Sequence, residues 1–233
     1  IVTERFRGRV GLPGPLSRLN GFFEGLLAFA DRTFNRTMFI FIILGVVLSC
    51  LHQSSLGGLM VIAKYKMHEL WWTPILPLLF LLSAFSVGYP MVIFESMIAS
   101  KVFNRKPEMH ILSPLGKIIP FLLFVYIAFK IGDLSLRGQL GAMFAGTAQS
   151  NLFLAEFGLG VLLPFFMLLT SRVRRSAPLL FSAATLVVLG VVMNRINVFL
   201  TAYTPVYKQE QYFPSFGEIM VSVGVVAALM FVY

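Results

Sequence analysis

The amino-acid sequence predicts an all-α integral membrane protein, a multispan bundle of about six transmembrane helices. Of its 233 residues, 58% are hydrophobic and only 12% are charged, and the mean hydropathy is +0.84. Soluble domains contain about 25% charged residues, so this composition excludes an ordinary soluble fold. The apolar runs are also too long, and alternate too little, for a membrane β-barrel with strands of about ten residues.

The N-terminal region, residues 1–37, differs in composition from the rest of the chain. Residues 1–20 place four arginines between Gly and Pro residues, which predicts a surface loop. Residues 21–37 mix apolar with charged positions and suit a short helix in the membrane interface. We expect the transmembrane bundle to occupy residues 38–233. Because the chain begins without Met and stops within an apolar run, we expect it to be the C-terminal part of a longer protein.

Six apolar segments approach the roughly 20 residues that a membrane-spanning helix needs. They are residues 34–52, 71–100, 111–131, 151–170, 177–201 and the stretch from about 215 onward. The first is expected to end near the polar tetrad HQSS, and Trp71 and Trp72 are expected to anchor the second at the membrane interface. Pro90 lies inside the second span and predicts a kink. Small residues recur every three or four positions around Glu95, so we expect Glu95 to face other helices rather than lipid.

The positive charges predict the orientation of the spans. The segments 1–37, 101–117 and 171–176 fall on one side and hold 13 of the 19 Lys and Arg residues, so that side is expected to be cytoplasmic. This interpretation assigns the net charge of +9 to topology and predicts no nucleic-acid partner. Cys50 is the only cysteine, which excludes an intramolecular disulfide and Cys-rich zinc or iron–sulfur sites within this chain.

Polar and ionisable side chains inside apolar spans are costly and are therefore candidates for function. His52 could hydrogen-bond a quinone carbonyl or pass a proton, and Glu95 could carry a proton or a cation. A further group near the outer side could line an aqueous or quinone-headgroup cavity: Asp133, Glu156, Asn194, Arg195 and Asn197. Structural alternatives remain open. His52 can be satisfied by backbone or water, Glu95 can pair with a neighbouring side chain, and polar residues near span ends can simply be hydrated.

The histidine count disfavours a haem held by two histidines. The sequence has only His52, His68 and His110, and His110 is expected at the opposite end of the spans from the other two. A His52–His68 pair is the one combination that could meet. The sequence also lacks the phosphate-binding, dinucleotide-binding, zinc-protease and nucleophile-elbow motifs of soluble enzymes.

Several motifs occur in an order and spacing that resemble one known family. They are HQSSLG at residues 52–57, KMHELW at 66–71, VIFE at 92–95, FKIGDL at 129–134, then Glu156, NRINVFLTAY at 194–203 and YFPSFGEIMVSVG at 212–224. Over roughly residues 20–233 the sequence resembles the NrfD/polysulfide-reductase membrane-subunit family. Within it, the sequence is most similar to the HybB-type membrane subunit of nickel–iron hydrogenases.

The resemblance implies a helical bundle of about eight to ten spans that exchanges electrons with the quinone pool beside a ferredoxin-like iron–sulfur subunit. HybB-like members are expected to carry no haem. His52 and Glu95 match positions tied in the family to the quinone and proton route. The first four spans, where the family places much of its quinone pocket, are expected to lie outside this sequence. The chain departs from the family pattern at Glu69, where many relatives have Pro, and at Pro90.

The preferred hypothesis is a haem-free, quinone-interacting, multi-pass subunit of a respiratory oxidoreductase in the bacterial inner membrane. It would pass electrons between an extracytoplasmic iron–sulfur subunit and menaquinone or ubiquinone, with proton translocation as an added expectation. It would not be catalytic alone and would bind no metal, because the catalytic metals belong to a partner such as a nickel–iron hydrogenase. The expected quinone and proton path comprises His52, Glu95, Asp133, Glu156, Arg195 and Asn197.

Two alternatives stay open at this point. A secondary transporter or ion channel would use Glu95 and the Asn194/Asn197 face, although no pair of repeats with matching broken helices is visible in the sequence. An anchor that only docks the partner subunit would need none of these side chains for chemistry.

Overall fold

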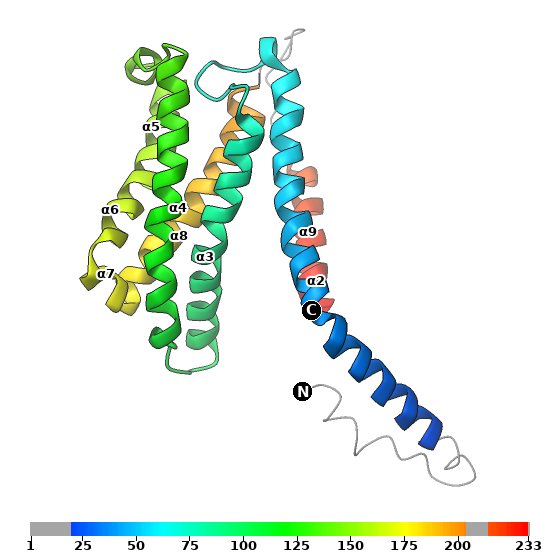
Figure 1. The fold of residues 1–233 in the computed structure, drawn as a ribbon. Helices are drawn as coiled ribbons and strands as arrows, with labels where there is room; N and C mark the ends of the chain where they lie inside the picture. The colour runs from blue at the N-terminus through cyan, green and yellow to red at the C-terminus, as the bar shows by residue number, and fades with distance from the viewer. Residues whose placement is uncertain (1–19, 204–213, 233) are drawn as a thin grey trace. The chain divides into compact units, whose positions relative to one another are not determined.

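The computed structural model describes residues 20–203 and 214–232 of the chain (Figure 1). Within these residues, five helices are long and apolar enough to cross a membrane, and one shorter apolar helix follows them. The chain divides into two compact units, residues 1–52 and 53–233. The multispan all-α class predicted from the composition is therefore confirmed.

The first unit contains most of α2, Asn20–Ile62. This helix is continuous, so the expected boundary between residues 37 and 38 falls inside it. The HQSS tetrad also lies within the helix rather than at its end, because the segment contains no proline to stop it. The last turns of α2 belong to the second unit, where Gly57 permits a close approach. A Cβ at Gly57 would lie 2.9 Å from the Leu76 carbonyl oxygen and 2.9 Å from Pro77 Cα.

The second unit is built around a bundle of helices. The hairpin of α3 (Leu76–Val102) and α4 (Met109–Leu136) is visible in Figure 1, and α8 (Ala177–Ile196) packs against α3. A broken span completes the bundle. It consists of α5 (Ala148–Phe157), the π-helical η4 (Gly158–Leu162) and α6 (Leu163–Leu169). The remaining elements are η2 (Lys64–Lys66), η3 (Gly141–Phe144), α7 (Ser171–Arg175), the π-helical η5 (Asn197–Thr201) and α9 (Phe216–Val232).

The sequence analysis expected the second span to begin at residue 71, but the segment before α3 is not helical. Residues 71–75 contain turns but no helix, and the helix begins only at Leu76, with Pro77 in its first turn where a missing N–H costs least. This segment is fixed to the end of α8 and η5, because the His68 N–H donates to the Ala202 carbonyl at 2.9 Å. Trp71 is completely buried, so its expected role as an interface anchor is wrong.

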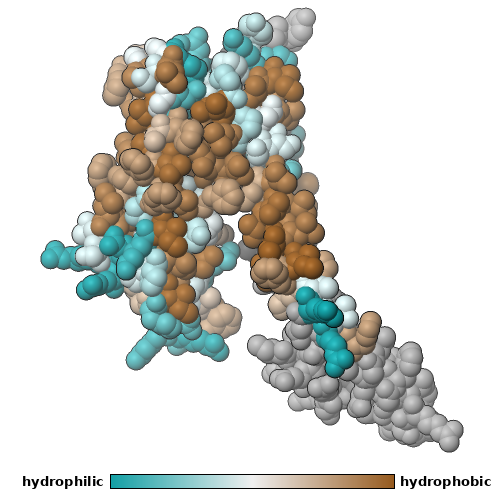
Figure 2. Space-filling view, in the orientation of Figure 1, coloured by the Kyte–Doolittle hydropathy of each residue, from teal (hydrophilic) through white to brown (hydrophobic). Residues whose placement is uncertain are grey.

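The basic loops lie together at one end of the bundle. The α3–α4 loop carries Arg105 and Lys106, and Arg174 of α7 lies against Gly116 near the start of α4. Figure 2 shows hydrophilic side chains gathered at this end and a hydrophobic surface over the middle of the bundle. We call this the basic end. Its cytoplasmic orientation stays a prediction from the positive-inside rule.

Candidate functional site

A buried carboxylate, Glu156 of α5, lies at the centre of a polar cluster at the end of the bundle opposite the basic end. The side chain is 4% exposed. Its Oε2 accepts hydrogen bonds from Trp71 Nε1 at 3.0 Å and Asn197 Nδ2 at 2.8 Å, and its Oε1 accepts one from Asn194 Nδ2 at 2.6 Å. Burying a carboxylate is costly unless donors replace water. Three N–H donors on two oxygens provide that replacement.

Helix periodicity explains why α8 and the π-helical η5 that continues it supply two of these donors. Asn194 and Asn197 are three residues apart, so they project from one face of the helix toward Glu156. The sequence analysis predicted this alignment, and the structure confirms it. The helix becomes π-helical from Asn197 to Thr201, and the span that carries Glu156 becomes π-helical directly after it. Such π segments are frequent at functional sites in helices.

Arg195 connects this carboxylate to two further elements. Its Nη1 donates to Asn194 Oδ1 at 2.8 Å, and Asn194 in turn donates to Glu156. Its Nη2 donates to Ser83 Oγ of α3 at 2.7 Å, and its Nε donates to Gln53 Oε1 of α2 at 3.2 Å. The guanidinium also lies over the ring of Phe80, 3.7 Å from its centroid. Arg195 therefore forms a three-helix junction, joined to Glu156 through a single amide.

A second ionic group lies near the first. Asp133 of α4 accepts a hydrogen bond from Thr73 Oγ1 at 2.6 Å on Oδ1. Its Oδ2 forms a two-pronged ion pair with Arg137, at 2.9 Å from Nε and 2.7 Å from Nη2. Arg137 also donates from Nη1 to the Glu69 carbonyl at 2.8 Å. The pairing compensates the cost of burying Asp133.

Lys130 is 2% exposed and contacts the loop segment of residues 69–73, which also contacts Glu156 and Asp133. Its Nζ donates to the Leu70 carbonyl at 3.4 Å and lies 5.2 Å from the ring centroid of Phe153. The loop segment is thus fixed by Arg137, Lys130, Glu156 and Asp133 in succession. Hydrogen bonds to charged side chains, rather than regular secondary structure, therefore hold this segment in place.

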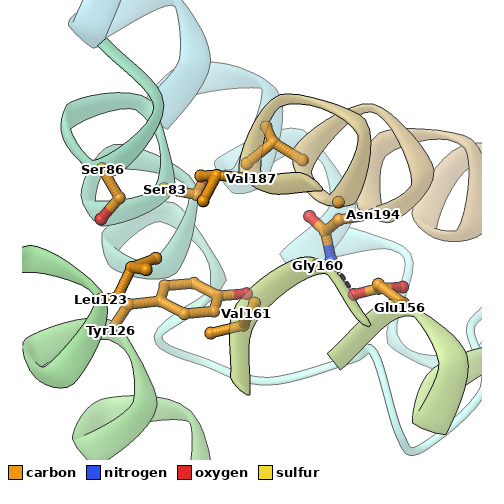
Figure 3. Close-up of a pocket in the computed structure, with 11 residues that line it drawn as sticks. Ser83, Ser86, Leu123, Tyr126, Glu156, Gly160, Val161, Val187 and Asn194 are labelled. Atoms are coloured by element: carbon orange, nitrogen blue, oxygen red, sulfur yellow. Dashed lines mark hydrogen bonds between the residues drawn. The ribbon is translucent and has the colours of Figure 1, made fainter. Parts of the chain in front are cut away.

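A small cavity adjoins Glu156 on the side toward the middle of the bundle (Figure 3). Its volume is about 20 Å³, and its lining includes Ser83, Ser86, Tyr126 and Asn194. Ser86 Oγ is buried and has no hydrogen-bond partner among the described residues. A cavity above roughly 10–15 Å³ with several polar neighbours can hold one water molecule. A water here would satisfy Ser86 and extend the Glu156 network toward α3.

The structure brings together some of the predicted site residues and separates others. Glu156, Arg195 and Asn197 form one network, and Asp133 belongs to the neighbouring ion pair. His52 is exposed on α2, in the first unit. Glu95 is exposed on α3, contrary to the expectation that it faces other helices.

The sequence analysis missed several participants, of which Trp71, Tyr126 and Lys130 are the most prominent. A signal for two of them was present in α4. Tyr126, Lys130, Asp133 and Arg137 are spaced by four, three and four residues, which places four polar groups on one face of an apolar span. Trp71 carried no comparable signal, because a tryptophan beside another tryptophan at the end of an apolar segment is typical of an interface anchor.

The hydrogen bond from Trp71 to Glu156 gives a direct test of the network. Trp71→Phe keeps an aromatic ring at this position but removes the N–H donor. A hydrogen bond to a buried charged group contributes about 1.5–3 kcal/mol. We expect a clearly lower thermal unfolding midpoint of the purified protein. Trp72→Phe is the matched control, because Trp72 Nε1 donates only to the neutral Val61 carbonyl, at 3.2 Å. Equal shifts for the two variants would contradict the importance of the Glu156 contact.

Known proteins similar to this chain are membrane subunits of redox complexes. The chain is 37% identical over 196 residues to the "Probable Ni/Fe-hydrogenase 2 b-type cytochrome subunit" of Escherichia coli (strain K12), an alignment that covers 83% of this chain and 50% of that protein. It is 29% identical over 219 residues to the "Menaquinone reductase, integral membrane subunit" of Nitratidesulfovibrio vulgaris, covering 84% and 52%. The chain thus spans about half the length of these relatives. No solved structure matches it significantly.

The first of these names corrects the expectation of a haem-free subunit. A b-type cytochrome subunit is by name a haem protein, so the expected absence of haem is contradicted. The histidine count concerned only possible haem ligands within the 233 residues of this chain. Among the described residues of the second unit, His68 precedes α3 while His110 lies exposed at the basic end. These two histidines lie at opposite ends of the bundle and do not fit the two sides of one haem.

The family assignment agrees with the helical architecture and with the buried polar cluster. Residues 13–206 match the family described as "Polysulphide reductase, NrfD". This match covers most of the chain and includes Glu156, Asn194, Arg195 and Asn197. The chain therefore belongs to the polysulphide reductase NrfD family and is a multi-pass protein of the inner membrane.

Proposed function

We propose that this chain is part of the quinone-interacting membrane subunit of a respiratory oxidoreductase. The observation that carries the proposal is the buried Glu156–Asn194–Arg195 network. Three donors compensate the carboxylate there. The guanidinium is held by the Phe80 ring and by four hydrogen bonds, one of them to the Phe80 carbonyl at 3.4 Å. Ionisable groups held inside a membrane bundle at such cost are functional candidates. The family and the name of the menaquinone reductase relative support quinone as the substrate class.

In this proposal the electrons come from partner subunits. An extracytoplasmic iron–sulfur subunit exchanges electrons with the quinone, and a catalytic subunit, such as the hydrogenase that the Escherichia coli relative's name implies, supplies or consumes them. Reduction of a quinone to the quinol takes up two electrons and two protons. This chain contributes side chains that help to hold the quinone in place and that conduct protons to or from it.

The proposed path comprises Glu156, Arg195, Asn197 and Asp133 at the end opposite the basic end, together with His52 and Glu95. Arg195 is treated as a positioning residue, because its permanently charged guanidinium orients Asn194 and through it Glu156. The cavity beside Tyr126 and Ser86 offers a place for a proton-carrying water next to Glu156. In the same proposal, these groups also conduct protons across the membrane.

Arg195→Gln tests the proposal in membranes that contain the whole complex. Two activities are measured: turnover from the electron donor to quinone, and turnover from the same donor to a soluble dye. The variant loses the charge-assisted contacts to Ser83 and Gln53, and hydrogen bonds of this kind contribute about 1.5–3 kcal/mol. We therefore expect quinone-linked turnover to fall roughly tenfold to a hundredfold, with dye-linked turnover nearly unchanged.

Arg172→Gln is the matched control, because Arg172 is exposed in α7 at the basic end. His52→Ala is examined in the same pair of assays and should also slow only quinone-linked turnover. Equal loss of both activities in Arg195→Gln would indicate a purely structural junction. Unchanged quinone turnover in an assembled complex would separate the network from the quinone.

A further inference from the structure

A second cavity lies at the basic end of the bundle, away from the Glu156 network. Its volume is about 400 Å³. It lies between the last turns of α3, the loop that joins α3 to α4, and the first two turns of α8. All of these parts belong to the second unit of the chain. Neither the family assignment nor the proposed quinone chemistry gives this groove a role.

The lining of this groove has two chemical parts. One part is apolar and includes Ile98, Val102 and Phe181. The other is cationic and consists of Lys101 at the end of α3 and Arg105 in the loop that follows. Phe181 is held in position by stacking on Phe94, with ring centroids 5.5 Å apart and an interplanar angle of 6°. The apolar wall is therefore already formed.

The position of the groove relative to the membrane follows from α3. This helix is a candidate span that ends at Val102, so Lys101 lies where the hydrocarbon region ends and the lipid headgroups begin. Lys and Arg side chains near the ends of spans extend toward the headgroup region. The apolar part of the groove continues from this level into the depth of the acyl chains, because Ile98 lies one turn further into the membrane.

We propose that this groove is a binding site for an anionic phospholipid. The headgroup phosphate lies between Lys101 and Arg105, and an acyl chain lies along Ile98 and Phe181. Basic pockets between transmembrane helices are suited to anionic lipid headgroups. A free phosphate ion would use the cationic part but not the apolar wall. A neutral lipid would fill the wall but would lack the net negative charge that the two cations attract.

The proposal is tested on the purified, delipidated complex by native mass spectrometry during titration with phosphatidylglycerol or phosphatidylcholine. The double variant Lys101→Gln/Arg105→Gln removes both cations of the groove. Lys106→Gln/Lys117→Gln removes the same charge from the same end of the bundle, and neither of its positions lines the groove. All four side chains are exposed, so neither double variant disturbs the core.

The native complex should bind phosphatidylglycerol more tightly than phosphatidylcholine. In Lys101→Gln/Arg105→Gln the affinity for phosphatidylglycerol should fall about tenfold or more, while the matched control should stay within about twofold of the native complex. Excess inorganic phosphate should not displace the lipid. The proposal is overturned if both double variants lose affinity equally or if the native complex does not distinguish the two lipids. It is also overturned if phosphate displaces the lipid, or if another part of the complex covers the groove so that no lipid binds.

Discussion

Glu156→Gln should produce the largest loss of any single polar substitution in this chain. The variant keeps the size of the side chain but replaces one acceptor oxygen by an N–H₂ group, which then faces at least one of the donors from Trp71, Asn194 and Asn197. It also removes the negative charge that is linked through Asn194 to the partly buried Arg195. A hydrogen bond to a buried charged group contributes about 1.5–3 kcal/mol, and three such bonds end on this carboxylate. The loss of one corresponds to a factor of roughly ten to a hundred in the population of the correctly packed state.

The measurement combines thermal unfolding of the purified complex with quinone-linked and dye-linked turnover per assembled complex. We expect a lower unfolding midpoint and a quinone-linked turnover reduced about a hundredfold, with dye-linked turnover retained. Glu108→Gln is the control, because Glu108 is an exposed carboxylate before α4. A complex that fails to assemble would identify Glu156 as a structural centre. A complex that assembles and reduces quinone normally would remove Glu156 from the proposed path.

Gly160→Ala should be nearly as damaging, for a different reason. Gly160 of the π-helical segment and Gly190 of α8 are in contact, and a Cβ on either glycine would overlap the Cα of the other. Carbon atoms that are not bonded need a separation of about 3.5–4.0 Å, so the two helices must move apart by about 1 Å. Glu156 lies four residues before Gly160, and Asn194 lies four residues after Gly190. The separation would therefore stretch the 2.6 Å hydrogen bond between Asn194 and Glu156.

Gly158→Ala is a closely matched control, because a Cβ at Gly158 meets nothing within 4 Å among the described residues. We expect Gly160→Ala to lower both the yield of assembled complex and its quinone-linked turnover, and Gly158→Ala to leave both near the native level. Overpacking of a well-packed interior costs about 1–3 kcal/mol. If the two alanine variants behave alike, close contact between these two spans is not needed for the site.

The candidate site could be predicted from the sequence only in part. Glu156, Arg195, Asn197 and Asp133 were identified because polar groups in apolar spans are costly wherever they lie. The partners that join different helices could not be predicted, because they are distant in the sequence. Trp71 and Glu156 are 85 positions apart, and Gln53 and Arg195 are 142 apart. No local pattern specifies a contact across such separations.

The errors of the sequence analysis have physical causes of the same kind. Trp71 was interpreted as an interface anchor because its neighbours in sequence are apolar and aromatic, whereas its hydrogen-bonding partner comes from α5. The HQSS tetrad was interpreted as a helix end because hydropathy falls there, yet polar residues do not interrupt backbone hydrogen bonding and α2 continues to Ile62. The expected absence of haem rested on the histidine count of this chain and on its resemblance to HybB-type subunits, and the name of the hydrogenase relative contradicts it.

The sequence by itself determined that this is a multispan helical membrane protein, and it placed one span at residues 177–201, where the structure has α8 and η5. These features depend on composition and on length relative to the bilayer, which are local properties of the chain. Only the tertiary structure decided that Asn194 and Asn197 bond Glu156, that Arg195 joins three helices, and that Glu95 is exposed. Each of these depends on how distant helices rotate and approach one another, and that is set by packing contacts such as Gly160 against Gly190.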